Sequence, residues 1–154
     1  MSAPSPFVPA RPDSAGRTDV LLVDDDARLA ASLSQLLRRC GYVAASVGQG
    51  REALEFLASH PVALVVSDIF MPDCDGLELL RALRPCTSRP RLVVMSGSNA
   101  LHVPGMLGAA QMLGADRTIA KPFDPAQLLD LVREMIGPPV SPPPPAALSD
   151  PAVS

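Results

Sequence analysis

One pattern recurs five times in the middle of this chain: a short apolar run, a turn, and a segment with helical periodicity. The apolar runs cover residues 20–23, 44–47, 63–66, 92–95 and, more weakly, 117–119. They are largely continuous rather than strictly alternating with polar residues. Continuous apolar runs indicate strands that are covered on both faces, as in a parallel sheet.

Between these runs, apolar residues return at the spacing of one buried helix face. They are Leu29, Leu33, Leu36, Leu37 and Cys40 in the first helical segment, and Leu128, Leu129, Val132, Met135 and Ile136 in the last. Gly41 is expected to end the first helix, and Asp124 with Pro125 to begin the last. Shorter helices are predicted at 51–58, 77–83 and 104–113. Parallel strands joined by crossover helices make a doubly wound α/β sheet.

The two ends of the 154-residue chain differ in composition from its middle. Of its 18 prolines, four lie in the first 12 residues and seven lie from Pro138 onward. We therefore predict disordered tails over 1–17 and 138–154, around one folded domain over 18–137. The proline run at 142–145 is either part of a solvated tail or a docking segment for a proline-binding module.

Charge, hydropathy and cysteine content argue against several classes of protein. A formal net charge of −3 and a pI near 5.2 argue against a nucleic-acid-binding surface. No apolar run approaches the roughly 18 residues of a membrane span, and the N-terminus lacks a secretory signal. Three cysteines without C-x-x-C spacing indicate reduced thiols in a cytoplasmic protein. The isolated His60 and His102 make a zinc site improbable.

Charged and hydroxyl side chains follow four of the five predicted strands. Asp24 and Asp25 follow the first strand, Asp68 the third, Ser96 the fourth and Lys121 the fifth. In doubly wound sheets, ligands bind beyond the carboxyl ends of the strands, so we expect these groups to converge. Adjacent carboxylates repel one another unless a cation lies among them. The pattern predicts a magnesium site next to a hydroxyl and an ammonium group.

Four stretches resemble the receiver domain of bacterial two-component response regulators, in the same order and spacing. They are LLVDDDAR, VVSDIFMPDCDGLELL, VVMSGS and GADRTIAKPF. The resemblance extends over about 18–136. It implies a flavodoxin-like five-stranded parallel sheet in the order 2-1-3-4-5 with helices on both faces.

The resemblance also implies roles for individual residues. Asp68 would accept a phosphoryl group, with Ser96 and Lys121 as its catalytic neighbours. The implied Mg²⁺ ligands are Asp24, Asp25, Asp68 and the backbone carbonyl of Phe70. The bond from Lys121 to Pro122 is typically cis in the family, and Gly97 would leave room for the phosphoryl group.

Three further acids are interpreted as structural. Asp26 is expected to cap the first helix, because its side chain can accept a hydrogen bond from a free helical N–H group. Asp73 and Asp75 are expected in a turn beside the site.

Two features depart from the family pattern. Thr118 stands where many receivers have an aromatic switch residue, so we expect any rearrangement to use the loop after Ser96 and its following helix. Phe70 and Ser98 stand where the family tunes the phosphoryl lifetime. Neither residue offers a carboxylate or carboxamide to hold an attacking water, which predicts slow self-dephosphorylation.

The functional prediction is a stand-alone, single-domain response regulator. It would take a phosphoryl group from a phosphohistidine of a histidine kinase or phosphotransfer protein, and signal by binding an unknown downstream protein. It would not be an enzyme in the turnover sense and would bind neither nucleic acid nor membrane. Two alternatives stay open: a degenerate receiver that binds partners without phosphorylation, and a haloacid-dehalogenase-type Mg²⁺-dependent phosphatase.

Overall fold

The computed structural model describes residues 17–69, 76–86, 89–96 and 114–139. Within these ranges the elements, in chain order, are β1 (Thr18–Val23), α1 (Ala27–Arg39), β2 (Ala44–Val47), α2 (Gly50–Ser59), β3 (Val62–Asp68), α3 (Gly76–Leu83), β4 (Arg91–Ser96), β5 (Arg117–Ala120) and α5 (Pro125–Ile136). The helix predicted at 104–113 lies outside the described residues, as does nearly all of both predicted tails.

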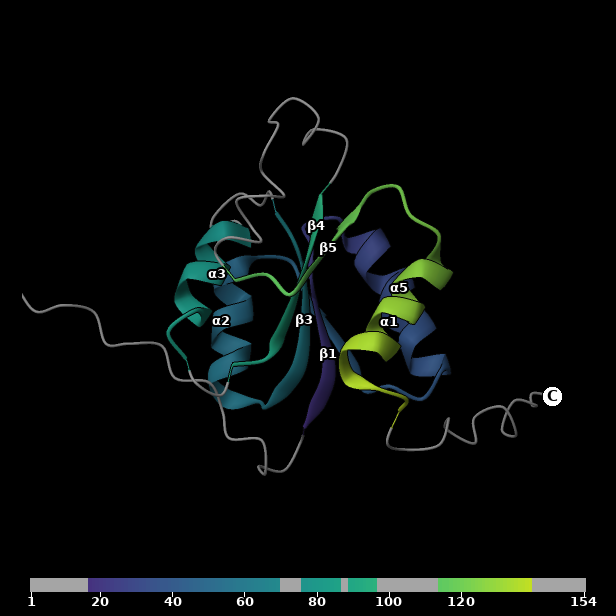
Figure 1. The fold of residues 1–154 in the computed structure, drawn as a ribbon, viewed down its shortest axis with the longest axis horizontal. Helices are drawn as coiled ribbons and strands as arrows, with labels where there is room; N and C mark the ends of the chain where they lie inside the picture. The colour runs from purple at the N-terminus through teal and green to yellow at the C-terminus, as the bar shows by residue number, and fades with distance from the viewer. Residues whose placement is uncertain (1–16, 70–75, 87–88, 97–113, 140–154) are drawn as a thin grey trace, which may run out of the picture.

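All five strands pair in parallel, in the order β2-β1-β3-β4-β5. Helices α1 and α5 cover one face of the sheet, and α2 and α3 cover the other (Figure 1). The flavodoxin-like order predicted from the resemblance is therefore confirmed. β1 lies between β2 and β3, so the chain moves outward from β1 to β2 and then crosses back over β1 to β3. The strand order reverses at this point, and in doubly wound sheets ligands bind beyond the carboxyl ends of the strands there.

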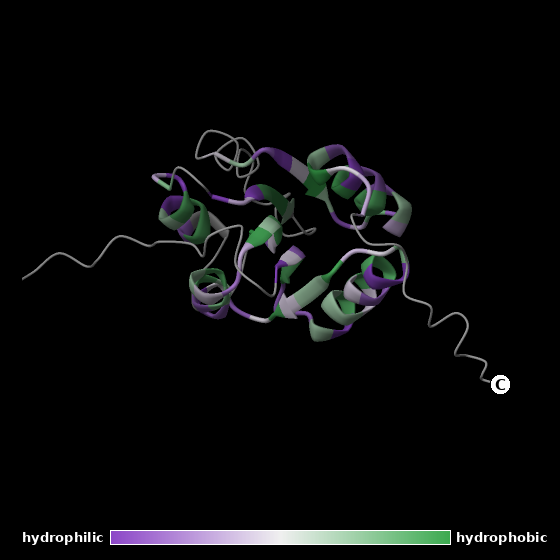
Figure 2. Cartoon of the chain, turned by 90° about the horizontal axis from the view of Figure 1, so that it is seen from below, coloured by the Kyte–Doolittle hydropathy of each residue, from purple (hydrophilic) through white to green (hydrophobic). Residues whose placement is uncertain are grey.

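The apolar residues of β1 alternate between two hydrophobic layers. Val20 and Leu22 pack with α1 and α5, whereas Leu21 and Val23 pack with the helices of the other face. All four side chains are completely buried, and burial of each such side chain contributes about 1.5–3 kcal/mol. The helices turn their apolar sides towards the sheet and their polar sides outward (Figure 2). Two-sided burial is the physical reason for the continuous apolar runs.

The ends of α1 match the sequence-based prediction. Asp26 accepts a hydrogen bond from the Leu29 N–H at 3.2 Å and is the N-cap. At the other end Gly41 has φ of 100°, a left-handed conformation that glycine adopts without a steric penalty. The N–H groups of Gly41 and Tyr42 then bond to carbonyls of the last helical turn, both at 3.0 Å. This is a Schellman motif, which ends the helix sharply.

Helix α5 also begins where predicted. The Asp124 side chain accepts from the N–H of Ala126 at 3.2 Å, and Gln127 Oε1 accepts from the N–H of Asp124 at 2.8 Å. This capping box, with Pro125 in the first turn, satisfies donors that the helix itself cannot use.

Strand β2 covers the same residues as the apolar run that predicted it, whereas the other four strands are longer than their runs. β3 continues to Asp68, which pairs with Met95 of β4, because main-chain pairing does not require an apolar side chain. No helix among the described ranges combines the length and the apolar character that crossing a membrane requires. Cys40 and Cys86 do not form disulfide bonds in the described part of the chain, and Cys74 lies outside it.

Candidate functional site

Strands β1, β3 and β5 deliver three of the predicted site residues to one edge of the sheet. Asp24 follows β1 directly, Asp68 is the last residue of β3, and Lys121 follows β5. This edge is the upper one in Figure 1, where the strands end. Since parallel strands share one direction, their carboxyl ends meet there.

Three carboxylates form the centre of the site. Oxygens of Asp24, Asp25 and Asp68 all lie within 4.8 Å of one another. Asp24 is buried, with 2% of its surface exposed, whereas Asp25 is exposed. Oxygen donors of this kind suit a hard divalent cation, and two ligands of one Mg²⁺ ion lie about 3–4 Å apart. The cluster therefore fits Mg²⁺, with a small adjustment or a bridging water.

Lys121 joins two members of this cluster. Its Nζ donates to Asp24 Oδ2 at 2.6 Å and to Asp68 Oδ2 at 3.3 Å. Burial by itself would lower the pKa of Lys121, but the hydrogen bond and charge of Asp24 and the charge of Asp68 outweigh burial. The pKa of Lys121 is consequently raised above its ordinary value of 10.5, and the side chain stays cationic at neutral pH.

Asp24 is fixed in place from both ends of its carboxylate. Its Oδ1 accepts from the N–H of Asp26 at 2.9 Å, while Oδ2 accepts from Lys121. The Asp24 N–H itself bonds to the carbonyl of Val47 at the end of β2. The three consecutive acids therefore have different roles: Asp24 points into the site, Asp25 lies at its exposed side, and Asp26 caps α1.

The structure leaves part of the predicted site undescribed. Ser96 ends β4 and pairs with Ala120, one residue before Lys121, but its side chain is outside the described part. The other predicted positions outside the described residues are Phe70, Asp73, Asp75, Gly97 and Ser98.

Strand β5 and the residues just after it bear on two expectations drawn from the resemblance: the cis bond before Pro122 and the missing aromatic switch residue. The Lys121–Pro122 bond is cis. Thr118 lies in β5, paired with Val94 and half-buried, so no aromatic ring is present at that position.

One residue that the sequence reasoning missed sets the position of β5. Asp116 Oδ2 accepts from the N–H of Leu92 at 2.8 Å and from Arg89 at 3.3 Å. These bonds join the start of β5 to the start of β4. Since β5 spans only Arg117–Ala120, fixing its start also fixes where Lys121 emerges. The aspartate after a glycine and an alanine gives only a turn-like signal in the sequence.

The family profile described as the response regulator receiver domain matches residues 20–133. Among curated proteins, the chain is 35% identical over 117 residues to "DNA-binding response regulator MtrA" of Mycobacterium tuberculosis and of Mycobacterium leprae. That match covers 76% of this chain and 50% of each relative. The chain thus spans about half the length of these relatives.

Solved structures give the same result. A signal receiver domain of a response regulator from Bermanella marisrubri has a TM-score of 0.70 and 31% identity, covering 78% of this chain and 98% of that one. A response regulator receiver protein from Pseudomonas putida has a TM-score of 0.67 and 29% identity, covering 79% and 99%. With the sheet order and the acidic edge described above, these matches show that the chain belongs to the response regulator receiver domain family of two-component signalling.

Proposed function

We propose that this chain accepts a phosphoryl group on Asp68 from a phosphohistidine of a histidine kinase or histidine phosphotransfer protein. One observation carries the proposal: Asp68 lies in a cluster with Asp24 and Asp25 and within hydrogen-bonding distance of Lys121. Its side chain is 13% exposed.

The proposed transfer needs little acid–base chemistry from the protein. A carboxylate oxygen of Asp68 forms a bond to phosphorus as the phosphorus–nitrogen bond of the donor breaks. The electron pair of that bond returns to the imidazole nitrogen. Positioning and charge neutralisation dominate such transfers. Lys121 stays protonated because of its raised pKa, so it can donate to a phosphoryl oxygen as negative charge develops.

The residues that would hold Mg²⁺ are Asp24, Asp25 and Asp68, together with the backbone carbonyl of Phe70. Three carboxylates and one ammonium leave an excess of negative charge, which opposes the approach of an anionic donor. A bound divalent cation supplies the charge neutralisation that admits the donor. The Ser96 hydroxyl is proposed as a further donor to the phosphoryl group.

Output is proposed to occur by contact with another protein. A phosphoryl group adds roughly −1.5 to −2 charges next to the site, which shifts the balance between two surface conformations. The curated relatives are named DNA-binding regulators, and this chain spans about half of their length. We propose protein contact, not DNA binding, for the domain described here. Phosphorylation is stoichiometric, so the domain is not an enzyme that turns over a substrate.

Intact-mass measurement after incubation with acetyl phosphate tests the proposal. The chain should gain the mass of one phosphoryl group in Mg²⁺, and little when the metal is chelated. Asp68→Asn should gain nothing. Asp124→Asn is the matched control, because asparagine also caps helices and Asp124 lies outside the cluster. An unmodified wild-type chain would support a degenerate receiver instead.

Two further measurements separate the remaining interpretations. Sustained hydrolysis of small phosphoesters would indicate a phosphatase, whereas a single modification per chain indicates a receiver. The family match already favours the receiver. We also propose slow self-dephosphorylation from Phe70 and Ser98, and a phosphorylated half-life of only seconds in Mg²⁺ would contradict it.

A further inference from the structure

Strand β5 carries Lys121 to the carboxylate cluster, although its own side chains give it little support. It stands last in the strand order, so among the described strands it pairs only with β4. None of its four residues is buried, and Ile119 is the one that packs against a described hydrophobic cluster. The position of β5 along β4 is therefore fixed largely by polar contacts.

A shift of β5 along β4 would separate Lys121 from its partners. One residue of a strand spans about 3.3 Å, and a shift by one residue turns every side chain to the other face of the sheet. Lys121 Nζ lies 2.6 Å from Asp24 Oδ2 and 3.3 Å from Asp68 Oδ2. A side chain on the other face cannot keep these contacts. The register of β5 thus decides whether the ammonium group reaches the cluster.

The side chain of Asp116 replaces one main-chain bond where the ladder between β4 and β5 begins. In a regular parallel ladder with this register, the carbonyl of Leu92 accepts from the N–H of Asp116, and the Leu92 N–H donates to the carbonyl of Gly114. The first bond is present at 2.8 Å. In place of the second, the Leu92 N–H donates to Asp116 Oδ2 at 2.8 Å. Asp116 therefore binds both polar main-chain groups of Leu92.

Arg89 completes this arrangement from the segment before β4. Its Nη2 donates at 3.1 Å to the carbonyl of Gly114, the group that the ladder would otherwise use. Its Nη1 donates to Asp116 Oδ2 at 3.3 Å and to the carbonyl of Pro90 at 3.0 Å. Gly114 has φ of 114°, which turns the main chain out of strand geometry at this point. We call Asp116 and Arg89 the β5 clamp.

We propose that Asp116, held by Arg89, is a positioning residue for phosphoryl transfer to Asp68: it fixes the register of β5 and thereby the place of the Lys121 ammonium group. The inference rests on the transfer proposed above. The β5 clamp lies at the amino end of β5 and Lys121 directly after its carboxyl end, so Asp116 acts through the strand. A strand of four residues spans only about 13 Å, and it transmits a displacement of its start to its end.

The β5 clamp and the proposed metal ligands belong to different strands. Asp24 and Asp25 follow β1 and Asp68 ends β3, and both of these strands have neighbours on each side. Losing the clamp should therefore move Lys121 without moving the carboxylates. Transfer should slow because the ammonium group no longer neutralises the developing charge, whereas Mg²⁺ affinity should not fall. A general loss of structure would lower both.

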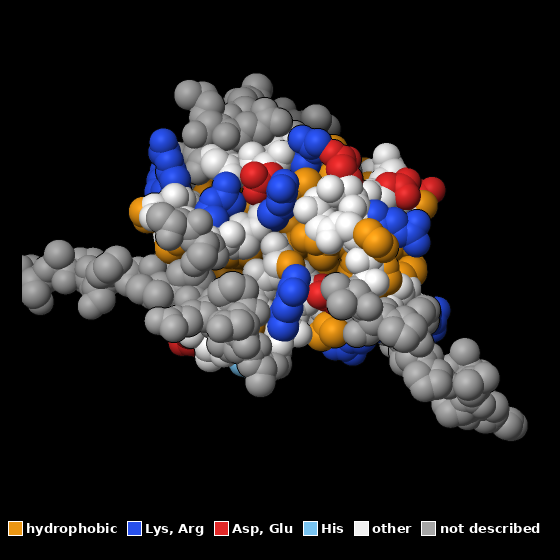
Figure 3. All heavy atoms as spheres, turned by 60° about the horizontal axis from the view of Figure 1, so that its bottom comes forward, with side chains coloured by type: hydrophobic (Ala, Val, Ile, Leu, Met, Phe, Trp, Pro, Cys, Tyr) orange, Lys and Arg blue, Asp and Glu red, His pale blue; other side chains and the backbone are white. Residues whose placement is uncertain are grey.

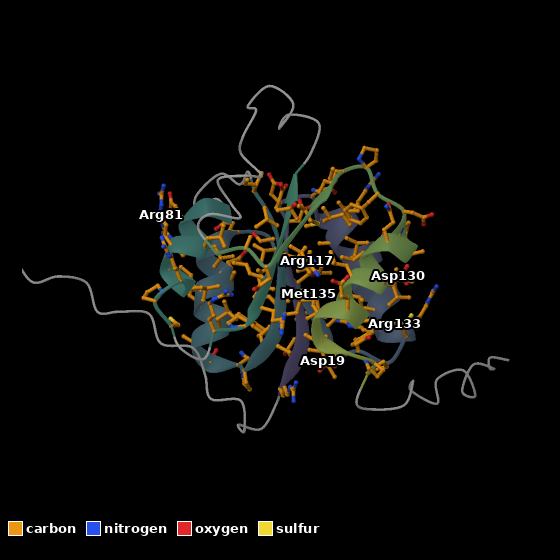
Figure 4. All side chains as sticks on the ribbon, in the orientation of Figure 1. Asp19, Arg81, Arg117, Asp130, Arg133 and Met135 are labelled. Carbon is orange, nitrogen blue, oxygen red and sulfur yellow. The ribbon has the colours of Figure 1, made fainter. Side chains whose placement is uncertain are left out.

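A second ion pair at β5 provides the matched comparison. Arg117 Nε lies 3.0 Å from Glu134 Oε2 and joins β5 to α5, and each side chain is 52% exposed. Figure 3 shows acidic and basic side chains next to one another at several places on the surface, and Figure 4 labels Arg117 beside Met135, the neighbour of Glu134. Exposed pairs of long side chains adapt to water and fix little. The Asp116 carboxylate instead binds the main chain of β4 directly.

Phosphorylation rates and Mg²⁺ affinities of matched variants test the proposal. Asp116→Ala should slow phosphorylation by acetyl phosphate at saturating Mg²⁺ about tenfold or more, because a small misplacement of a participating group strongly lowers the rate. Asp116→Asn should have a smaller effect, since its amide oxygen can still accept from the Leu92 N–H. Mg²⁺ affinity, from NMR amide shifts, should fall by no more than about twofold in either variant. Glu134→Gln should change neither quantity by more than about twofold.

Isotope-labelled lysine supplies a readout that does not depend on phosphorylation. Lys121 is the only lysine of the chain, so its Cε gives a single NMR signal. In Asp116→Ala this signal should shift towards its value in urea, whereas Glu134→Gln should keep the wild-type signal. If Asp116→Ala does not fold, Asp116→Asn and Arg89→Met serve in its place. Their effects on the Lys121 signal should be non-additive, because both residues belong to one clamp.

Three results would overturn the proposal. The first is a wild-type rate and a wild-type Lys121 signal in Asp116→Ala, or in both Asp116→Asn and Arg89→Met. The second is an equal loss in Asp116→Ala and Glu134→Gln, and the third is a parallel loss of transfer and Mg²⁺ affinity. A wild-type chain that gains no phosphoryl group contradicts the proposed function instead, and the Lys121 signal then still decides whether the β5 clamp positions the lysine.

Discussion

Lys121 Nζ lies 2.6 Å from Asp24 Oδ2 and 3.3 Å from Asp68 Oδ2. The lysine is therefore held more closely by a proposed metal ligand than by the proposed phosphoryl acceptor. Both oxygens of Asp24 are occupied, because its Oδ1 accepts from the N–H of Asp26. Each carboxylate oxygen can accept a second partner, so a divalent cation can bind Asp24 beside the N–H on Oδ1 or beside Lys121 on Oδ2. In either case metal and lysine are coupled through this one carboxylate.

Chemical modification of Lys121 should report on this coupling. Lys121 is the only lysine of the chain, so an amine-reactive reagent has one side-chain target besides the N-terminus. Its raised pKa keeps the neutral, reactive amine scarce. Asp24→Asn removes the closest carboxylate, and each unit of pKa lost raises the reactive fraction about tenfold. Peptide mapping by mass spectrometry measures the rate, with the N-terminal amine as internal reference. A rate unchanged from wild type, or equalled by Asp124→Asn, would contradict the geometry.

Replacing Lys121 should make the free energy of unfolding more sensitive to Mg²⁺. In Lys121→Met the buried carboxylate of Asp24 loses its cationic partner, which should lower the free energy of unfolding by about 1–3 kcal/mol without metal. Mg²⁺ should then stabilise the variant more than the wild type, because a cation again lies among the carboxylates. Urea unfolding with and without Mg²⁺ measures both effects. Arg51→Met, at an exposed helix position, is the control; an equal metal response in all three proteins would count against the interpretation.

Much of this site could be predicted because topology alone brings strand ends together. The acids after β1 and β3 and the lysine after β5 needed only the parallel order to converge. The sequence could not show which carboxylate Lys121 prefers, since that depends on side-chain rotamers and on the Asp26 N–H that fixes Asp24. It also hid Asp116, whose bonds to Leu92 and Arg89 depend on strand register. Strand ends were underestimated because main-chain pairing continues past the apolar run, as at Asp68.

The Schellman motif after α1 gives a backbone test of the fold. Gly41 has φ of 100°, where any Cβ is strained, so Gly41→Ala should lower the free energy of unfolding by about 1 kcal/mol or more. Gly48→Ala is the matched control: Gly48 has no positive φ, and an added Cβ would meet only the end of the Glu52 side chain at 3.8 Å. Urea denaturation curves of the two variants check this. Equal stabilities would show that the motif contributes little.

Tyr42 links the ends of two helices on the same face of the sheet. Its hydroxyl donates to the carbonyl of Gly137, after α5, at 2.7 Å, and its ring is 3% exposed after α1. Burial raises the pKa of Tyr42 above 10.0, although Arg133 acts in the opposite direction. A raised pKa in the folded state means that the protonated tyrosine stabilises the fold. That contribution is complete below about pH 10 and is lost as the pH rises through the raised pKa.

Tyr42→Phe should therefore have two effects. At neutral pH it should lower the free energy of unfolding by about 0.5–1.5 kcal/mol, because the bond to Gly137 is lost. Above about pH 10 the difference in the free energy of unfolding between the variant and the wild type should shrink, since only the wild type then loses the contribution of a protonated phenol. The chain has one tyrosine and no tryptophan, so near-ultraviolet absorbance of tyrosinate follows this group directly. A tyrosine that titrates identically in the folded chain and in urea would refute the buried hydrogen bond.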